Sequence, residues 1–127
     1  MTSIQITRFG GPEVLRAVDS PPPPLTADGV RIAVKAAGVC FADVQMRMGL
    51  YPEGLRPPFV PGYEVAGVVT EVGPRAGTFR PGDRVLAVPR FGGYATEIVL
   101  PEAQVRATPA HLEDTEAAAI PVSFLTA

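Results

Sequence analysis

Residues 61–73 read PGYEVAGVVTEVG. From Glu64 to Val72 almost every residue is small or β-branched, a composition that favours a β-strand. Because apolar residues follow one another with little alternation, we expect this strand to be buried on both faces. Gly67 within the run predicts that another backbone approaches closely at this point.

Other short strands are expected on either side of this segment. Residues 30–39 alternate between apolar and polar side chains, which predicts a half-buried strand. Similar runs occupy residues 3–7, 14–18, 84–88 and 94–100. The 15 prolines and 13 glycines are scattered between these runs and indicate tight turns. The chain is therefore expected to be mainly β, as a barrel or a sandwich.

Four consecutive prolines occupy residues 21–24. Proline has no backbone N–H to donate, so this run cannot pair inside a sheet. We expect an extended surface connector between two strands. The alternative is a ligand for a proline-recognition domain.

Two short helices are also expected. Residues 41–48 show helical periodicity, in which Asp43 and Arg47 are spaced to form an ion pair. Three apolar residues would share one face of this helix: Phe41, Val44 and Met48. Residues 112–120 predict a second helix, which Pro121 is expected to break.

Composition excludes several classes of protein. The formal net charge of -2 provides no electrostatic footprint for nucleic acid or an anionic membrane. Cys40 is the only cysteine, which excludes an internal disulfide and suits a reducing compartment. The N-terminus does not resemble a signal peptide, and no apolar run approaches the roughly 20 residues of a transmembrane helix. A cytoplasmic protein without nucleic-acid or membrane partners is expected.

Four segments, in this order, resemble the quinone oxidoreductase branch of the medium-chain dehydrogenase/reductase superfamily. They are FGGPEVL at 9–15, GVCFAD at 38–43 with GLYP at 49–52, PGYEVAGVV at 61–69, and FRPGDRV at 79–85 followed by GGYA at 92–95. The resemblance implies a GroES-like (alcohol dehydrogenase-like) β-barrel with short helices over residues 1–120. Residues 121–127 would then begin the linker into a nucleotide-binding Rossmann domain. The uncovered apolar cluster at 120–125 also suggests that the chain stops before a further domain.

The same resemblance bears on zinc. In the zinc-dependent branch, a cysteine and a histidine at positions similar to Cys40 and Tyr63 hold a catalytic metal. A neutral phenol is a poor zinc ligand, and no cysteine-rich lobe follows residues 83–85. The sole histidine, His111, is expected at the surface. No metal site and a zinc-independent enzyme are therefore expected.

The resemblance implies reduction of a quinone or an α,β-unsaturated carbonyl by NADPH, which the absent domain would mainly bind. The residues expected at the catalytic centre are Tyr51, Tyr63 and Asp43. Gln45 is expected to line the substrate site together with Tyr51. Cys40, Phe41 and Thr126 are expected beside the nicotinamide. Structural readings remain open for some of these residues: a loop tyrosine packed on the barrel for Tyr51, the ion pair with Arg47 for Asp43, and a small semi-buried residue for Cys40.

Two other functions remain open on the sequence. The chain could be a non-catalytic GroES-like module that binds a partner protein. It could also be an enoyl reductase unit of a polyketide or fatty-acid pathway, which differs only in its substrate. Under the enzyme hypothesis, this piece alone is expected to be inactive and the full-length protein to be a homodimer.

Overall fold

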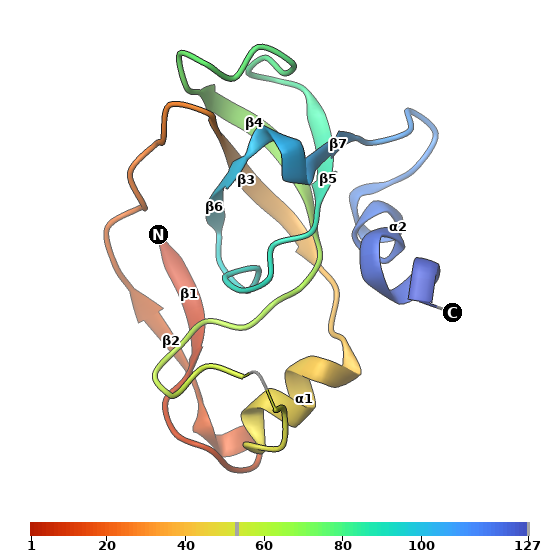
Figure 1. The fold of residues 1–127 in the computed structure, drawn as a ribbon. Helices are drawn as coiled ribbons and strands as arrows, with labels where there is room; N and C mark the ends of the chain where they lie inside the picture. The colour runs from red at the N-terminus through yellow and green to blue at the C-terminus, as the bar shows by residue number, and fades with distance from the viewer. Residues whose placement is uncertain (53, 127) are drawn as a thin grey trace.

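The computed structural model describes residues 1–52 and 54–126. The strands are β1 (Thr2–Ile6), β2 (Leu15–Asp19), β3 (Gly29–Ala37), β4 (Val65–Val72), β5 (Arg84–Ala87), β6 (Glu97–Pro101) and β7 (Val105–Ala107). The helical segments are η1 (Pro12–Val14), α1 (Phe41–Arg47), η2 (Glu102–Gln104), α2 (Asp114–Ala118) and η3 (Ile120–Phe124), the last a π-helical turn. Figure 1 shows β1, β2 and α1 gathered in one part of the molecule and the other strands in a second part.

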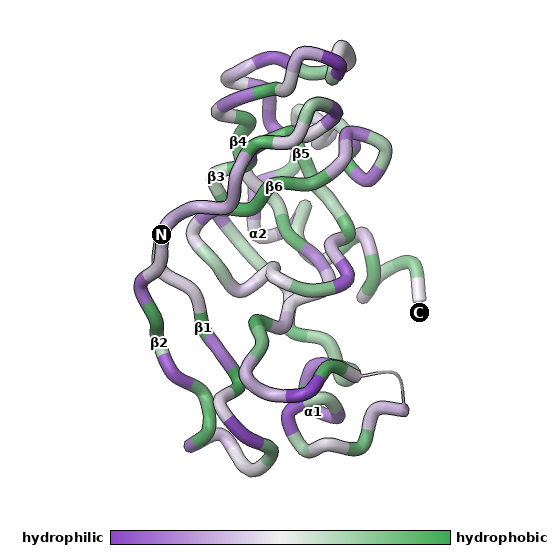
Figure 2. Tube along the Cα trace, turned by 60° about the vertical axis from the view of Figure 1, so that its left-hand side comes forward, coloured by the Kyte–Doolittle hydropathy of each residue, from purple (hydrophilic) through white to green (hydrophobic). Residues whose placement is uncertain are grey.

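The main sheet is antiparallel, with the strand order β6-β3-β4-β5-β7. It curls into a half-barrel, and Figure 2 shows many hydrophobic residues along its strands. The core that the sheet encloses consists mostly of valine, isoleucine, leucine and alanine side chains. Val30, Ile32, Val65 and Val85 have no exposed surface. The predicted mainly β, GroES-like barrel with short helices is confirmed.

Strand β4 lies in the middle of this sheet, as its sequence predicts. Val34 of β3 is paired with Gly67, and a Cβ on Gly67 would lie 2.1 Å from the carbonyl oxygen of Ala33. The predicted close approach of another backbone is therefore confirmed. Burial on both faces is correct only for the first part of the strand, because Thr70 and Glu71 are exposed.

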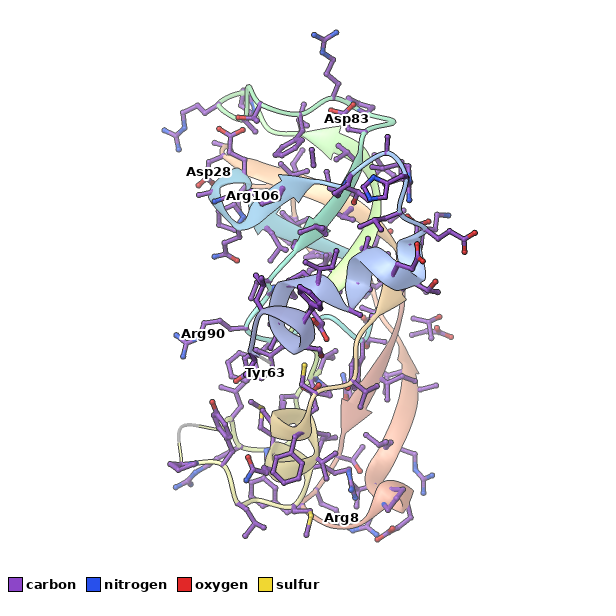
Figure 3. The ribbon with its side chains drawn as sticks, turned by 90° about the vertical axis from the view of Figure 1, so that its right-hand side faces the viewer. Arg8, Asp28, Tyr63, Asp83, Arg90 and Arg106 are labelled. Atoms are coloured by element: carbon purple, nitrogen blue, oxygen red, sulfur yellow. The ribbon has the colours of Figure 1, made fainter. Side chains whose placement is uncertain are left out.

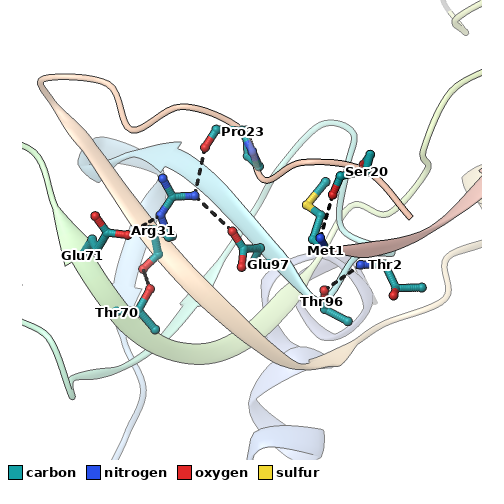
Figure 4. Close-up of polar contacts among 9 residues, drawn as sticks. All are labelled: Met1, Thr2, Ser20, Pro23, Arg31, Thr70, Glu71, Thr96 and Glu97. Atoms are coloured by element: carbon teal, nitrogen blue, oxygen red, sulfur yellow. Dashed lines mark hydrogen bonds and ion pairs between the residues drawn. The ribbon is translucent and has the colours of Figure 1, made fainter. Parts of the chain in front are cut away.

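The connector at residues 21–24 joins β2 to β3 and contains no strand, as predicted. Arg31 of β3 binds the connector through the carbonyl oxygen of Pro23, at 2.9 Å (Figure 4). The same guanidinium pairs with Glu71 of β4 at 2.9 Å and with Glu97 of β6 at 3.1 Å. Arg31 thereby ties the connector to three adjacent strands.

The second part of the molecule has its own small core. Ile6, Val14, Met46 and Phe59 are buried together there. Helix α1 contributes Met46, and its other buried residue is Asp43. The predicted apolar face of α1 is therefore wrong, since the side chains of Phe41 and Met48 are 75% and 50% exposed.

The predicted ion pair within α1 is also replaced by other contacts. Arg47 donates to the carbonyl oxygen of Gly10 at 2.8 Å, while the carboxylate of Asp43 turns inward. The reason is local: Asp43 is the third residue of the helix and caps its N-terminus by accepting from the backbone N–H of Cys40. Helical spacing alone does not reveal this competing partner.

The C-terminal helix packs against the outside of the sheet. Ala117 and Ala118 of α2 are buried against Ala66 of β4. Helix α2 ends before Pro121, as predicted, but the chain then continues coiling as η3. In the parts of the chain that the structure describes, no helix is long and apolar enough to cross a membrane.

Candidate active site

Most of the residues expected at the site lie where the two parts of the molecule meet. The site is formed by the start of α1, the segment just before β4, the loop before β6, and η3. In Figure 3, Tyr63 lies at a height between α1 and the C-terminal helical segment. The polar contacts below show how these segments are joined.

Asp43 joins three of these segments. Its Oδ2 accepts hydrogen bonds from the backbone N–H of Cys40 at 3.0 Å and from the hydroxyl of Tyr94 at 2.9 Å. Its Oδ1 accepts from the backbone N–H of Gly62 at 3.2 Å. Burial, together with the negative charge of Asp43, raises the pKa of Tyr94 far above its ordinary value. Tyr94 therefore remains a donor, and Asp43 fixes the segments that carry Cys40 and Tyr63.

Tyr63 and Tyr51 form a pair of phenols. The hydroxyl of Tyr63 donates to that of Tyr51 at 3.3 Å, and both side chains are half-buried. Burial, then the hydrogen bond with Tyr51, raises the pKa of Tyr63 to about 12. The ring of Tyr63 also packs against Phe91, with 6.4 Å between the ring centroids. Tyr63 is therefore a fixed, neutral donor at physiological pH.

The proton of Tyr51 is left for another acceptor. A phenol has one proton to donate, and that of Tyr63 is already directed to Tyr51. Among the described residues, no group accepts a hydrogen bond from the hydroxyl of Tyr51. A carbonyl oxygen placed against the pair would receive that proton as a hydrogen bond.

Cys40 is a buried, neutral thiol. Burial raises its pKa to about 11; the hydrogen bond with Ser123 opposes this rise, and the charges of Glu64 and Asp43 add to it. Its Sγ lies 3.5 Å from Oε1 of Glu64 and 3.8 Å from Oγ of Ser123. Because the thiolate is the reactive form, this environment disfavours nucleophilic chemistry at Cys40.

Glu64 is buried next to this thiol. Its Oε2 accepts from the backbone N–H groups of Val122 at 2.9 Å and Ser123 at 3.0 Å, and its Oε1 accepts from the hydroxyl of Ser123. Burial alone would raise its pKa, but the hydrogen bonds from Ser123 and Val122 outweigh burial and lower the pKa. Glu64 is therefore a buried carboxylate that favours its charged form.

Large apolar side chains are exposed on both sides of the contact between Cys40 and Ser123. Val39 and Phe41 are 73% and 75% exposed, and Phe124 and Leu125 are each 71% exposed. Because Cys40 touches Ser123, the chain stretches that carry these side chains meet here. This grouping forms an open apolar surface next to a neutral thiol.

The structure brings together Tyr51, Tyr63, Asp43 and Cys40, with Phe41 exposed at the start of α1. Gln45 is half-buried on α1, and its backbone carbonyl accepts from Leu50 at 2.9 Å. Thr126 is exposed at the end of the described chain, beyond η3. Among the hydrogen bonds of the described residues, none joins the side chain of Gln45 or Thr126 to the tyrosine pair.

Sequence reasoning assigned no role to Glu64, Ser123 or Tyr94. Glu64 carried a signal, because it is a charged residue at the start of a strand expected to be fully buried. A buried carboxylate requires donors, and these come from residues 58 and 59 positions further along the chain. No local pattern indicates such distant partners.

The donor set does not fit a zinc ion. No group of three or more His, Cys, Asp or Glu residues that could hold a metal occurs within residues 1–52 and 54–126. The position at which the zinc-dependent branch has histidine carries Tyr63, whose raised pKa keeps it a protonated phenol. His111 is exposed, as predicted.

Comparison with known proteins identifies the family. The model of the alcohol dehydrogenase GroES-like domain matches residues 26–110. The quinone oxidoreductase of Lama guanicoe is 37% identical over 129 residues, which cover 100% of this chain and 39% of that protein.

Solved structures agree with this match. The crystal structure of Escherichia coli quinone oxidoreductase complexed with NADPH has a TM-score of 0.92 at 33% identity, covering 99% of this chain and 39% of that one. The human synaptic vesicle membrane protein VAT-1 homolog-like protein has a TM-score of 0.95 at 32% identity, covering 99% and 41%. The chain thus spans about two-fifths of the length of these relatives. It belongs to the alcohol dehydrogenase GroES-like domain family, in the quinone oxidoreductase branch of the medium-chain dehydrogenase/reductase superfamily.

Proposed function

We propose that this chain is the acceptor-side domain of an NADPH-dependent oxidoreductase that reduces quinones or α,β-unsaturated carbonyls without zinc. Residues 1–120 would form this domain, and residues 121–127 would begin the linker to a nucleotide-binding domain. The observation that carries the proposal is the pair of phenols, Tyr51 and Tyr63, in a member of the quinone oxidoreductase branch. The reaction class is taken from the family, and the roles below are taken from the geometry.

The residues around Cys40 fit a nicotinamide ring. The ring is flat and largely apolar, and the exposed side chain of Phe41 and the neutral thiol of Cys40 offer matching surfaces. Thr126, also exposed, would add a hydroxyl on the opposite stretch of chain. When bound, NADPH supplies a hydride, and the protein has to place the acceptor and stabilise the charge that develops.

Tyr51 would stabilise the developing negative charge. Hydride addition to the acceptor sends an electron pair to the carbonyl oxygen, which then needs a hydrogen-bond donor. Tyr51 has a free proton, and Tyr63 holds the phenol of Tyr51 in place by donating to it. Tyr51 would act chiefly by hydrogen bonding to this carbonyl oxygen, and the product would take its final proton from solvent.

Asp43 and Gln45 would support the tyrosine pair and the acceptor, respectively. The carboxylate of Asp43 is already bonded to three protein donors, so its part is to position Gly62, and with it the neighbouring Tyr63. Gln45 lies on the same helix as Asp43 and offers an amide for the far side of the acceptor. The substrate side would therefore be held by α1 and the loop that carries Tyr51.

The test is NADPH oxidation by the full-length protein with a simple quinone, a simple enone and an enoyl thioester. Turnover with the quinone or the enone that persists after chelation of divalent metals is the expected result. A strong preference for the thioester would instead favour an enoyl reductase of a biosynthetic pathway. Absence of turnover with every acceptor would contradict the proposal and favour a binding module.

A further inference from the structure

Glu64 is a buried charged group that the reaction outlined above does not use. The residue has 0% exposed surface and directly precedes strand β4. Burying a carboxylate is costly unless its oxygen atoms are fully hydrogen-bonded. In this protein three donors come from a single distant turn, the backbone N–H groups of Val122 and Ser123 and the hydroxyl of Ser123.

The barrel is shaped to hold this carboxylate. A Cβ placed on Gly38 would lie 2.1 Å from Oε1 of Glu64, so any larger residue at position 38 would displace the carboxylate. The backbone N–H of Gly38 donates to the carbonyl oxygen of Glu64 at 3.0 Å, which fixes the residue from the other side. The thiol of Cys40 supplies a further donor at 3.5 Å.

The turn that Glu64 holds leads directly to exposed residues of the site. Ser123 is followed by Phe124 and Leu125, whose side chains project from the protein, and then by Thr126. None of the residues of η3 is buried, and among the described residues the side-chain hydrogen bonds of the turn all go to Glu64 and Cys40. The hydrogen bonds to Glu64 are thus the main polar link between this turn and the segment that carries Cys40 and Tyr63.

We propose that Glu64 is a positioning residue that fixes the turn at residues 122–123 against the barrel, and thereby sets the distance between the two sides of the nicotinamide site. Its effect on hydride transfer rests on the proposed function, whereas its effect on the turn does not. Reaction rates depend steeply on such placement, because a displacement of about 1 Å can cost roughly a hundredfold in rate. The charged form is required for full effect, since both oxygen atoms accept two hydrogen bonds.

Three variants of the full-length protein test this proposal. Glu64→Gln keeps the size of the side chain but replaces one acceptor oxygen with a donor. Ser123→Ala removes one donor at the surface and leaves the barrel intact. Glu71→Gln is the matched control, because Glu71 lies on β4, the strand that Glu64 directly precedes, but is exposed and pairs with Arg31.

The first measurement is hydrogen exchange at the backbone N–H groups of Val122 and Ser123. Exchange should become about tenfold faster in Glu64→Gln, about threefold faster in Ser123→Ala and unchanged in Glu71→Gln, because charge-assisted hydrogen bonds are lost only in the first two. Unchanged exchange in both Glu64→Gln and Ser123→Ala overturns the proposal. Ser123→Ala keeps the test decisive if Glu64→Gln fails to fold.

The second measurement is the split between kcat and KM for NADPH-dependent reduction, at a temperature well below the unfolding transition. Glu64→Gln should lower kcat about tenfold and change the KM of the acceptor less than twofold. Faster exchange with an unchanged kcat overturns the positioning role, because Glu64 would then stabilise the turn without affecting the reaction. If the wild-type protein reduces no acceptor, the proposed function fails, and the exchange measurement still decides whether Glu64 holds the turn.

Discussion

The hydroxyl groups of Tyr51 and Tyr63 lie 3.3 Å apart, with the hydroxyl of Tyr63 donating to that of Tyr51. This direction determines which phenol can serve a substrate. Tyr63 donates its only hydroxyl proton to Tyr51, so the hydroxyl proton that can still bond to a substrate is that of Tyr51. The two residues come from the loop after α1 and from the segment just before β4, so the fold itself creates the pair.

Replacing Tyr51 with phenylalanine should slow the reaction without unfolding the protein. The variant removes the donor for the carbonyl oxygen, and loss of one such donor at a partly exposed site should lower kcat about tenfold or more. Tyr63→Phe should have a smaller effect, because it removes only the support of Tyr51. Steady-state kinetics of the full-length variants measures both effects, and equal activity of Tyr51→Phe and wild type would contradict the role of Tyr51.

Stability at high pH should depend on Tyr63. Its pKa is raised in the folded protein from 10.0 to about 12, so between these values only the unfolded chain loses the proton. The contribution of Tyr63 to stability is therefore complete below pH 10 and is lost as the pH rises towards 12. Urea unfolding across this range should show a steeper loss for wild type than for Tyr63→Phe, and identical slopes would contradict the raised pKa.

Cys40 should react slowly with alkylating reagents. With a pKa of about 11 in place of 9.0, its thiolate fraction near pH 8 should be about a hundredfold lower than that of an ordinary thiol. Alkylation of the peptide that contains Cys40 can be followed by mass spectrometry, with the urea-unfolded protein as the control. Similar rates in the folded and unfolded protein would contradict the neutral, buried thiol.

Asp43 should contribute to stability through the three hydrogen bonds that its carboxylate accepts. In Asp43→Asn, an amide NH2 group replaces one of the two accepting oxygen atoms and leaves the donors that face it without an acceptor. This should lower the free energy of unfolding by about 2 kcal/mol. Tyr94→Phe removes one partner and should cost about 1 kcal/mol. Because both residues share one hydrogen bond, the two losses should not add in the double variant. Simple additivity in urea unfolding would contradict a shared network.

Local patterns predicted much of the barrel. The apolar run around Gly67 predicted a central strand, and the alternation at residues 30–39 predicted the neighbouring strand that it pairs with. These features depend on side-chain size and on period, which are visible in a single stretch of sequence. The short strand β7 was missed, because three residues carry no usable period.

The site was less predictable because its contacts join distant segments. The pairing of Tyr51 with Tyr63 depends on the course of a proline-rich loop, and that of Glu64 with Ser123 on a turn 59 residues further along. Helix α1 shows the same limit: its apolar periodicity indicated Phe41 as a buried residue, yet capping turned Asp43 inward and left Phe41 exposed. The family resemblance pointed to the region, and the geometry supplied the contacts.

The most direct test of the central claim is a single-turnover measurement of hydride transfer from NADPH to a quinone by the full-length protein after chelation of divalent metals. The account predicts that transfer persists in the wild-type protein and is slowed about tenfold in Tyr51→Phe. Transfer that is abolished by chelation and restored by added zinc, or that is equally fast in Tyr51→Phe, would contradict a metal-independent reaction supported by the Tyr51 phenol.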